Sequence, residues 1–346
     1  MFIKVAINGF GRIGRTFFRL AQERHELRIV AINDLADLEN LAYLLKHDSV
    51  YRDYSHKVSI DLKAKKLIVD NQRIDFLQEK DPAKLPWAKL GIDVAVESTG
   101  FFETFEGASS HLKAGAKRVV ITAPAKDDDE NMKLGATVLL GINEKDMAKV
   151  KITSNGSCTT NAVAPVVAVL SEKPGIKKAV LNTIHAYTAT QRIVDGSDAK
   201  DWRRGRAGAI SLVPSTTGAA IAVTKAVKNL KGIFDGIAIR TPVSTVSLAD
   251  ITFVANKKTS AEEINNILIE AAKKPHWKGI LGVTKEQLVS SDFVGITTAS
   301  IVDLNFTKVI GDDLVKVLAW YDNEWGYSAN LVEHVIKSGK LITKKP

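Results

Sequence analysis

The chain has 346 residues and a formal net charge of +9, and 45% of its residues are hydrophobic. This length predicts about two domains, and the apolar content is sufficient for conventional hydrophobic cores. The basic residues are scattered and not interleaved with aromatic residues, which argues against a dedicated nucleic-acid-binding protein, whereas an anionic small substrate fits the charge equally well.

The N-terminus and the cysteine content indicate the compartment. Residues 1–14 contain an apolar stretch that is too short and too rich in glycine for a signal peptide, and no apolar run reaches the roughly 20 residues of a membrane span. The single cysteine, Cys158, excludes a disulfide framework within the chain and fits a reducing compartment. We therefore expect a cytoplasmic protein with no membrane partner, and we predict no metal site.

The first motif is a glycine-rich turn between a strand and a helix. Residues 4–8 read as a short buried strand, and residues 16–26 as the helix after the turn. Between them lie Gly9, Gly11 and Gly14, in the spacing G-x-G-x-x-G that binds dinucleotides in this context. Gly9 makes the tight turn. Gly11 lets a pyrophosphate approach the backbone, and Gly14 allows the helix to pack on the strand.

An acidic residue follows where such sites bind ribose. A second strand, residues 28–33, ends just before Asp34, about 20 residues beyond the last glycine. The carboxylate can accept hydrogen bonds from the adenosine ribose hydroxyls and repel a 2′-phosphate, although an Asp after a strand is often only a turn former. Together with the glycines it predicts a dinucleotide site.

The parallel strand pattern is interrupted and then resumes. Residues 57–77 alternate in short stretches and predict a small antiparallel insertion. Residues 92–96, 118–122 and 151–154 again read as buried strands of a parallel sheet. Ligands bind at the carboxyl ends of such strands, so the residues there are candidate cofactor neighbours, with simple strand termination as the alternative. These candidates are Thr99, Gly100 and Thr122.

The only thiol lies in a polar setting. Residues 154–161 read Ser-Asn-Gly-Ser-Cys-Thr-Thr-Asn and are followed by an apolar, helix-like run. A single cysteine is usually a small buried hydrophobe. At a helix N-terminus, however, backbone N–H groups favour the thiolate and can hold an oxyanion, which makes Cys158 a candidate nucleophile.

A candidate base and candidate anion ligands come from the second half of the chain. A strand over residues 179–184 delivers His185 to a polar end, where it can pair with the thiol or be a structural residue. Residues 186–211 form a long polar loop of the kind that is usually functional. Thr217 and Gly218 open a helix whose N–H groups suit an anion or an ordinary cap.

The remaining elements of this half predict a different kind of sheet. Alternating strands favour a largely antiparallel sheet. The expected strands span residues 236–240, 246–255, 298–306 and 314–321, and the expected helices residues 260–274 and 330–341. At a strand end, Arg240 can hold a phosphate or form a surface ion pair. The predicted fold class is α/β, with an N-terminal Rossmann dinucleotide-binding domain plus an α+β catalytic domain.

Six motifs in order carry a resemblance to a known family. They are INGFGRIGR at the start, SNGSCTTN at Cys158, HAYTATQ from His185, STTGAA from Ser215, RTPV from Arg240 and WYDNEWGYS from Trp320. Along essentially its whole length the chain resembles glyceraldehyde-3-phosphate dehydrogenase of the phosphorylating, glycolytic type. The resemblance implies a homotetramer that uses NAD. It also implies a Rossmann domain over residues 1–157, completed by a C-terminal helix at about 324–346, and a catalytic domain over 158–323.

The resemblance also assigns roles to single residues. It implies that Cys158 is the nucleophile and His185 its base, in the conversion of D-glyceraldehyde 3-phosphate and inorganic phosphate to 1,3-bisphosphoglycerate with reduction of NAD. At the NAD site it implies Arg12, Ile13, Asp34, Lys80, Thr122 and Asn323. For the substrate phosphate and the inorganic phosphate it implies Ser157, Thr159, Thr188, Arg204, Thr217, Gly218 and Arg240.

Two other functions remain open at this point. The first is erythrose-4-phosphate dehydrogenase, a close relative with the same thiol and cofactor chemistry, whose thioester is hydrolysed by water. The second is a binding role on nucleic acids or cell surfaces, as a secondary activity of a basic protein. Such a role would not need the pair of Cys158 and His185.

Overall fold

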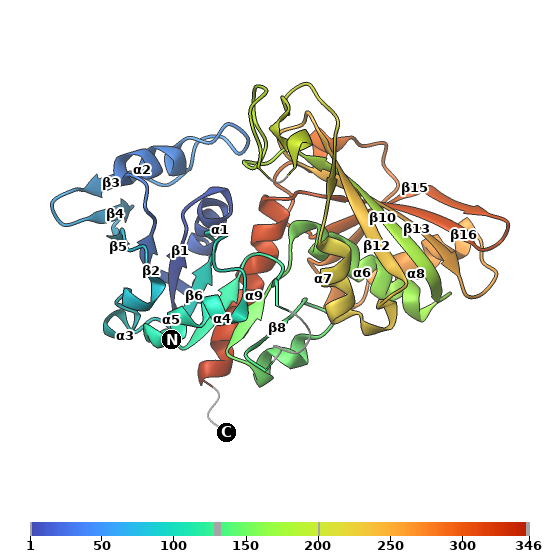
Figure 1. Ribbon diagram of the computed structural model, residues 1–346. Helices are drawn as coiled ribbons and strands as arrows, with labels where there is room; N and C mark the ends of the chain where they lie inside the picture. The colour runs from blue at the N-terminus through green and yellow to red at the C-terminus, as the bar shows by residue number, and fades with distance from the viewer. Residues whose placement is uncertain (1, 128–132, 200, 344–346) are drawn as a thin grey trace. The chain divides into compact units, whose positions relative to one another are not determined.

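The computed structural model of the protein describes residues 2–127, 133–199 and 201–343 (Figure 1). The chain folds into two compact units. The first consists of Met1–Val138, Glu144–Gly156 and Leu331–Pro346, and the second of Leu139–Asn143 and Ser157–Asn330.

Within the described residues, the first unit has one nine-stranded sheet with the order β3-β4-β5-β2-β1-β6-β7-β9-β8. The strands are β1 Ile3–Asn8, β2 Leu27–Asn33, β3 Val58–Asp61, β4 Lys66–Val69, β5 Gln72–Leu77, β6 Val94–Glu97, β7 Arg118–Ile121, β8 Gly135–Thr137 and β9 Ile152–Ser154. The helices are α1 Arg12–Gln22, α2 Leu38–Lys46, α3 Trp87–Leu90, α4 Phe105–Ala108 and α5 Ser110–Lys113.

The centre of this sheet is parallel and covered on both faces. In β1 the side chains of Val5, Ala6 and Ile7 are all fully buried, although successive side chains of a strand point to opposite faces. A strand buried on both faces is typical of a parallel α/β sheet. The registers place Asn8 beside Asn33 of β2 and beside Glu97 of β6, so three polar strand ends meet at one edge of the sheet.

The predicted insertion extends this sheet. Strands β3, β4 and β5 pair antiparallel with one another, as the alternation over residues 57–77 predicts. Strand β5 then pairs parallel with β2, which joins the insertion to the main sheet. The helix expected over residues 16–26 begins earlier, at Arg12, directly after the glycine-rich turn.

The second unit has a seven-stranded sheet in the described residues, with the order β11-β12-β10-β13-β16-β15-β14. Its strands are β10 Ile176–Ala186, β11 Val213–Thr216, β12 Phe234–Thr241, β13 Ser247–Ala255, β14 Leu281–Thr284, β15 Ser300–Ile310 and β16 Leu314–Tyr321. Its helices are α6 Cys158–Glu172, α7 Ala219–Ala226 and α8 Ala261–Ala272.

This sheet is largely antiparallel, because the parallel pairings are confined to β10 with β12 and β14 with β15. Burial alternates strictly along β13, so that one face of the sheet is covered and the other is open. The apolar helix α6 is buried along most of its length and packs against the sheet between α7 and α8 (Figure 1). The predicted fold class is therefore confirmed in both units.

The C-terminal helix α9, Trp325–Thr343, is longer than the predicted stretch over residues 330–341. From Leu331 onwards it belongs to the first unit. There Arg118 donates from Nε to Ser338 Oγ over 2.8 Å, and the buried His334 ring lies 2.8 Å from Thr153 Oγ1. These buried bonds tie the helix to β7 and β9. The last residues of the expected helix, 344–346, lie outside the described residues.

Candidate functional site

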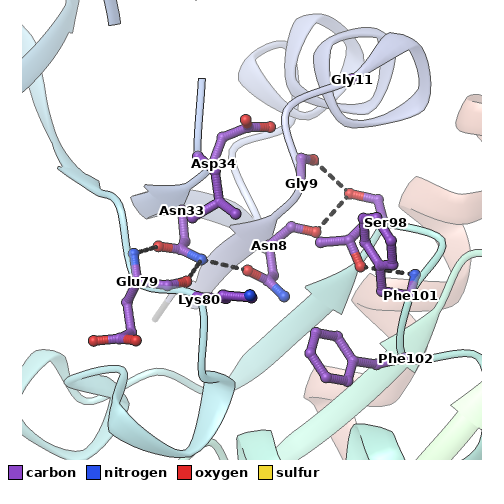
Figure 2. A pocket seen from close by; sticks show the side chains of 12 residues that line it. Asn8, Gly9, Gly11, Asn33, Asp34, Glu79, Lys80, Ser98, Phe101 and Phe102 are labelled. Carbon is purple, nitrogen blue, oxygen red and sulfur yellow. Dashed lines mark hydrogen bonds between the residues drawn. The ribbon is translucent and has the colours of Figure 1, made fainter. Parts of the chain in front are cut away.

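A cavity of about 520 Å³ lies at the carboxyl edge of the first unit's sheet (Figure 2). It is bordered by strand ends and by the turns that follow β1, β2 and β6. Its walls combine backbone, carboxylate, amide and aromatic groups. The lining residues are Asn8, Gly9, Gly11, Asn33, Asp34, Leu35, Glu79, Lys80, Ser98, Thr99, Phe101 and Phe102.

The glycine-rich turn is built as the motif requires. Gly9 has a φ of +94°, a backbone conformation that favours glycine. A Cβ on Gly14 would lie 2.2 Å from the carbonyl oxygen of Gly9, so helix α1 packs directly on the turn. A Cβ on Gly11 would have no heavy atom within 4 Å. The space beside Gly11 is therefore open to a ligand.

The Asp34 carboxylate is held in place at the cavity wall. It accepts hydrogen bonds from the backbone N–H groups of Phe10, at 2.6 Å, and Ala36, at 2.9 Å. These bonds join the turn after β2 to the glycine-rich turn. A carboxylate fixed in this way can accept further hydrogen bonds from ligand hydroxyls, because each of its oxygens has two lone pairs.

The predicted cofactor residues fall into two groups. Those that line the cavity are Gly9, Gly11, Asp34, Lys80 and Thr99. The others do not line the cavity. Gly14 packs on the turn, Gly100 follows Thr99 with a φ of +75°, and Thr122 donates its backbone N–H to Glu97 O. In α1, Arg12 bonds to Asp48 Oδ2 at 2.5 Å and is followed by Ile13, and in the second unit Asn323 accepts from Ser247.

Several lining residues were not anticipated from the sequence. Asn8 and Asn33 are the last residues of their strands, so the strand-end rule that selects Thr99 and Thr122 also applies to them. Glu79 and the pair of Phe101 and Phe102 carry no such signal. They come from loops whose path depends on the packing of the whole unit.

The thiol and the imidazole meet within the second unit. Cys158 is the first residue of α6, and Ser157 caps the helix by accepting a hydrogen bond from the Thr160 N–H at 3.1 Å. His185 is near the end of β10 and is 4% exposed. Its Nε2 lies 3.4 Å from the Sγ of Cys158. This is the contact that a nucleophile and its base require.

Arg240 joins the pair because of the sheet register. Strands β10 and β12 run parallel, with Arg240 directly beside His185. The guanidinium Nη1 lies 2.5 Å from His185 Nδ1 and 3.3 Å from the carbonyl oxygen of Ala186. The same Nδ1 is 2.7 Å from that carbonyl oxygen. The ring therefore has two competing partners on the side opposite the thiol.

Burial and the Arg240 charge act on both titrating groups. Burial raises the pKa of the Cys158 thiol, whereas the Arg240 cation and hydrogen bonds from Thr159 act in the opposite direction. Burial, followed by the Arg240 charge, lowers the pKa of His185 to about 3. At neutral pH the imidazole is thus neutral and able to accept a proton.

The other predicted phosphate ligands come from α6, from the loop after β10 and from the segment before α7. Thr159 is buried and bonds through Oγ1 to the Tyr321 hydroxyl at 2.9 Å. Arg204 donates to the carbonyl oxygen of Thr216 at 3.3 Å. Burial lowers the pKa of Arg240, and the positive charge of Arg204 acts in the same direction. The remaining three have local partners or positions. Thr188 bonds to Thr190, and Thr217 accepts a hydrogen bond from the Ala219 N–H. Gly218 is the residue immediately before α7.

Tyr321 is a site residue that sequence reasoning missed. Its hydroxyl lies 2.7 Å from Thr183 Oγ1 as well as contacting Thr159, and its ring packs edge-on against His185 with centroids 6.0 Å apart. Burial raises the pKa of this phenol, so it remains neutral. The residue lies within the WYDNEWGYS motif, but its position against the imidazole follows from the pairing of β16 with β13.

The described residues contain neither a membrane-spanning helix nor a metal-binding cluster. Within them no helix is long and apolar enough to cross a membrane. In the same part of the chain, no three His, Cys, Asp or Glu side chains gather into a group that could hold a metal ion.

Comparison with known proteins decides the family. Residues 3–105 match the family model described as the glyceraldehyde 3-phosphate dehydrogenase NAD binding domain, and residues 157–323 match the corresponding C-terminal domain. The chain belongs to the glyceraldehyde-3-phosphate dehydrogenase family. The recognised resemblance is thus confirmed, and the protein is an oxidoreductase that uses NAD.

Individual relatives are similar over their whole length. The chain is 45% identical to glyceraldehyde-3-phosphate dehydrogenase 1 of Bacillus subtilis over 344 residues, which cover 98% of this chain and 100% of the relative. It is 46% identical to glyceraldehyde-3-phosphate dehydrogenase of Zymomonas mobilis over 345 residues, covering 99% and 100%. It is 44% identical to glyceraldehyde-3-phosphate dehydrogenase 2 of Saccharomyces cerevisiae over 341 residues, covering 97% and 100%.

The cavity fits the cofactor of this family. All of its lining residues fall within the span that matches the NAD-binding domain. The open space at Gly11 can admit a pyrophosphate against the backbone, and the fixed Asp34 carboxylate can accept from ribose hydroxyls.

Substitution of the two glycines of the turn should affect stability differently. Gly14→Ala places a methyl group against the Gly9 carbonyl, so thermal stability should fall by about 1–3 kcal/mol and NAD binding with it. Gly11→Ala meets no protein atom and should keep wild-type stability, yet it should weaken NAD binding by filling the ligand space. Thermal unfolding and calorimetric NAD titration measure both. An unaltered melting temperature for Gly14→Ala, or wild-type NAD affinity for Gly11→Ala, would contradict this assignment.

Proposed function

We propose that the protein oxidises and phosphorylates D-glyceraldehyde 3-phosphate to 1,3-bisphosphoglycerate, with NAD as the hydride acceptor. The observation that carries this proposal is the 3.4 Å contact between Cys158 Sγ and His185 Nε2, with the Arg240 guanidinium beside the ring. A thiol, a neutral base and a cation form the set that thioester chemistry on a phosphorylated aldehyde needs. The names of the relatives agree with this substrate.

Cys158 starts the reaction as the nucleophile. His185 takes the thiol proton at Nε2, the thiolate attacks the aldehyde carbon, and N–H groups at the start of α6 stabilise the oxyanion. The imidazolium returns its proton to this oxygen, which gives the thiohemiacetal. His185 then takes the hydroxyl proton at Nε2, and bound NAD supplies the acceptor for the hydride. The product on Cys158 is a thioester. Inorganic phosphate attacks this thioester and releases the acyl phosphate, which restores the free thiol.

The tautomer of His185 must suit this role. To accept a proton at Nε2, the neutral ring carries its own proton at Nδ1 and donates it to the Ala186 carbonyl at 2.7 Å. Arg240 cannot donate to Nδ1 in that tautomer. A substrate phosphate would draw the guanidinium to itself by a bidentate, charge-assisted pair and leave the ring to the carbonyl.

The anion ligands then divide between charged and neutral donors. Arg240 and Arg204 supply charge, and the hydroxyl and backbone groups supply orientation. We assign to the substrate phosphate and the inorganic phosphate the residues Ser157, Thr159, Thr188, Arg204, Thr217, Gly218 and Arg240.

The NAD site belongs to the domain proposed over residues 1–157 with the C-terminal helix at about 324–346, and the chemistry to the domain over 158–323. The proposed NAD ligands are Gly9, Gly11, Arg12, Ile13, Gly14, Asp34, Lys80, Thr99, Gly100, Thr122 and Asn323. Asp34 would repel a 2′-phosphate as a like charge in a partly desolvated site, which favours NAD over NADP.

We also propose a homotetramer that works in the cytoplasm. On the open face of the second unit's sheet, Val180 and Ile237 are 52% and 51% exposed. In and beside the long loop, Ile193, Trp202 and Ile210 are more than 80% exposed. Apolar side chains exposed in this number are typical of subunit interfaces. We propose that other copies of the chain cover these exposed side chains. Nucleic acid or a cell surface is a secondary partner at most.

Phosphate dependence tests the proposed reaction against its nearest rival. With glyceraldehyde 3-phosphate and NAD, steady NADH formation should require inorganic phosphate, and its omission should leave a single burst that depends on Cys158. Cys158→Ala should abolish the burst. Turnover that continues at the same rate without phosphate would show that water resolves the thioester, as in erythrose-4-phosphate dehydrogenase, and that the proposed reaction is wrong.

A second prediction concerns the charge of Arg240. Because this cation favours the thiolate, Arg240→Leu should raise the pKa at which the Cys158 and His185 pair loses its proton and shift the alkylation profile with iodoacetamide to higher pH. The KM for the phosphorylated aldehyde should also rise about tenfold or more. The matched control is Arg203→Leu, because Arg203 is mostly exposed and pairs with Asp201. Coinciding alkylation profiles for Arg240→Leu and wild type would remove Arg240 from the site.

A further inference from the structure

A buried carboxylate lies next to the NAD cavity without lining it. Glu97 is the last residue of β6 and is 2% exposed. Neither Glu97 nor His111 is among the described residues that line the cavity. Its Oε2 accepts from Asn8 Nδ2 at 2.6 Å and from His111 Nε2 at 2.9 Å. Its Oε1 accepts from the Thr99 N–H at 2.9 Å and from the Thr99 hydroxyl. Four donors thus converge on one carboxylate.

The direction of each bond follows from its partners. Trp87 donates from Nε1 to His111 Nδ1 at 2.9 Å, and an indole N–H can only donate. His111 therefore carries its proton at Nε2 and donates it to Glu97. The histidine is neutral, so the group that gathers the donors is the carboxylate alone.

Hydrogen bonds across the sheet edge run in one donor-to-acceptor direction, towards Glu97. The Glu79 N–H donates to Asn33 Oδ1, and Asn33 Nδ2 donates in turn to Asn8 Oδ1 at 2.7 Å (Figure 2). Asn8 Nδ2 then donates to Glu97. Figure 2 shows the first two of these bonds between residues that line the cavity. A continuous chain of donors thus ends on Glu97 and fixes both amides of the cavity wall.

Glu97 also holds the turn that carries the aromatic wall. The Thr99 hydroxyl donates to Glu97 and accepts from the Phe101 N–H at 3.1 Å. Phe101 is 86% exposed, and Phe102 follows it in the cavity lining. Through Thr99, the Glu97 carboxylate is thus hydrogen-bonded to the base of this turn.

We propose that Glu97 is a positioning residue for the NAD site, which it keeps preformed by holding Asn8 and the turn from Thr99 to Phe101 in their bound arrangement. The inference rests on the proposed use of this cavity by NAD. Although Glu97 does not line the cavity, it raises cofactor affinity through Asn8 and Thr99, because a site that is ordered in advance does not have to be ordered on binding. His111 acts through Glu97, with its ring orientation fixed by Trp87.

Substitution by an amide should break this arrangement. In Glu97→Gln one of the two oxygens becomes an NH₂ group, which faces either the two donors of Thr99 or those of Asn8 and His111. His111 cannot change tautomer to accept from it, because Trp87 occupies Nδ1 with a donor. A buried donor without an acceptor is costly, so the turn should leave its position and NAD should bind about tenfold or more weakly.

The test compares NAD dissociation constants, by calorimetry, for four variants at a temperature well below every unfolding transition. Glu97→Gln and His111→Leu should both weaken NAD binding about tenfold. His111→Gln retains a donor for Glu97 and an acceptor for Trp87, and it should bind NAD within about threefold of wild type. The matched control is Asp303→Asn, because Asp303 is an equally buried carboxylate in the second unit that accepts from the Trp320 indole and the Asn305 N–H.

Alkylation of Cys158 without NAD should be unchanged in Glu97→Gln and His111→Leu, which excludes general loss of structure. If Glu97→Gln does not fold, the two His111 variants decide the question. Wild-type NAD affinity in both Glu97→Gln and His111→Leu, or equal weakening in Asp303→Asn, would overturn the inference. Failure of the proposed function itself is distinguishable, since wild-type protein would then not form NADH in a phosphate-dependent reaction.

Discussion

The proposed reaction depends on one constraint, the position of the Cys158 thiol against the His185 imidazole. It is set by one helix and one strand of the same unit: α6 begins at Cys158, and β10 ends one residue after His185. The parallel register of β10 with β12 then adds Arg240 beside the ring. Burial makes both the thiolate and the imidazolium costly in isolation, so a bound anion that engages Arg240 can change the balance at both groups. In the proposed mechanism, substrate recognition and base chemistry are thus coupled through one guanidinium.

In the first unit, packing and hydrogen bonds hold the backbone and polar groups that border the cavity. The packing of Gly14 on Gly9 brings α1 against the turn and leaves the space at Gly11 open. Donors from strand β1, helix α5 and the turn after β6 converge on the buried Glu97 carboxylate. Fully satisfied polar networks of this kind are rigid, because each member that moves leaves a buried partner unpaired.

How much of this could be predicted from the sequence depends on whether the signal is local. The glycine turn, Asp34 and the polar setting of Cys158 are local patterns, and the structure builds a cavity from the first two. Asn8 and Asn33 follow the same strand-end rule as Thr99, but it was not applied to them. The buried roles of Glu97 and Tyr321 could not be predicted, because their partners meet them only in the folded chain. Sheet register brings Asn8 to Glu97, whereas His111 comes from helix α5 and Thr159 from helix α6. The predicted start of α1, at residue 16, is too late, because the helix begins inside the glycine-rich motif, at Arg12.

The most direct test of this account is the chemical state of Cys158 after one turnover. Protein mixed with glyceraldehyde 3-phosphate and excess NAD, without inorganic phosphate, is quenched in acid, and the peptide containing Cys158 is examined by mass spectrometry. The proposed chemistry should leave a 3-phosphoglyceroyl thioester on Cys158, in an amount equal to the NADH formed, and this thioester should disappear when inorganic phosphate is added before the quench. An unmodified Cys158 peptide alongside a full equivalent of NADH would contradict it.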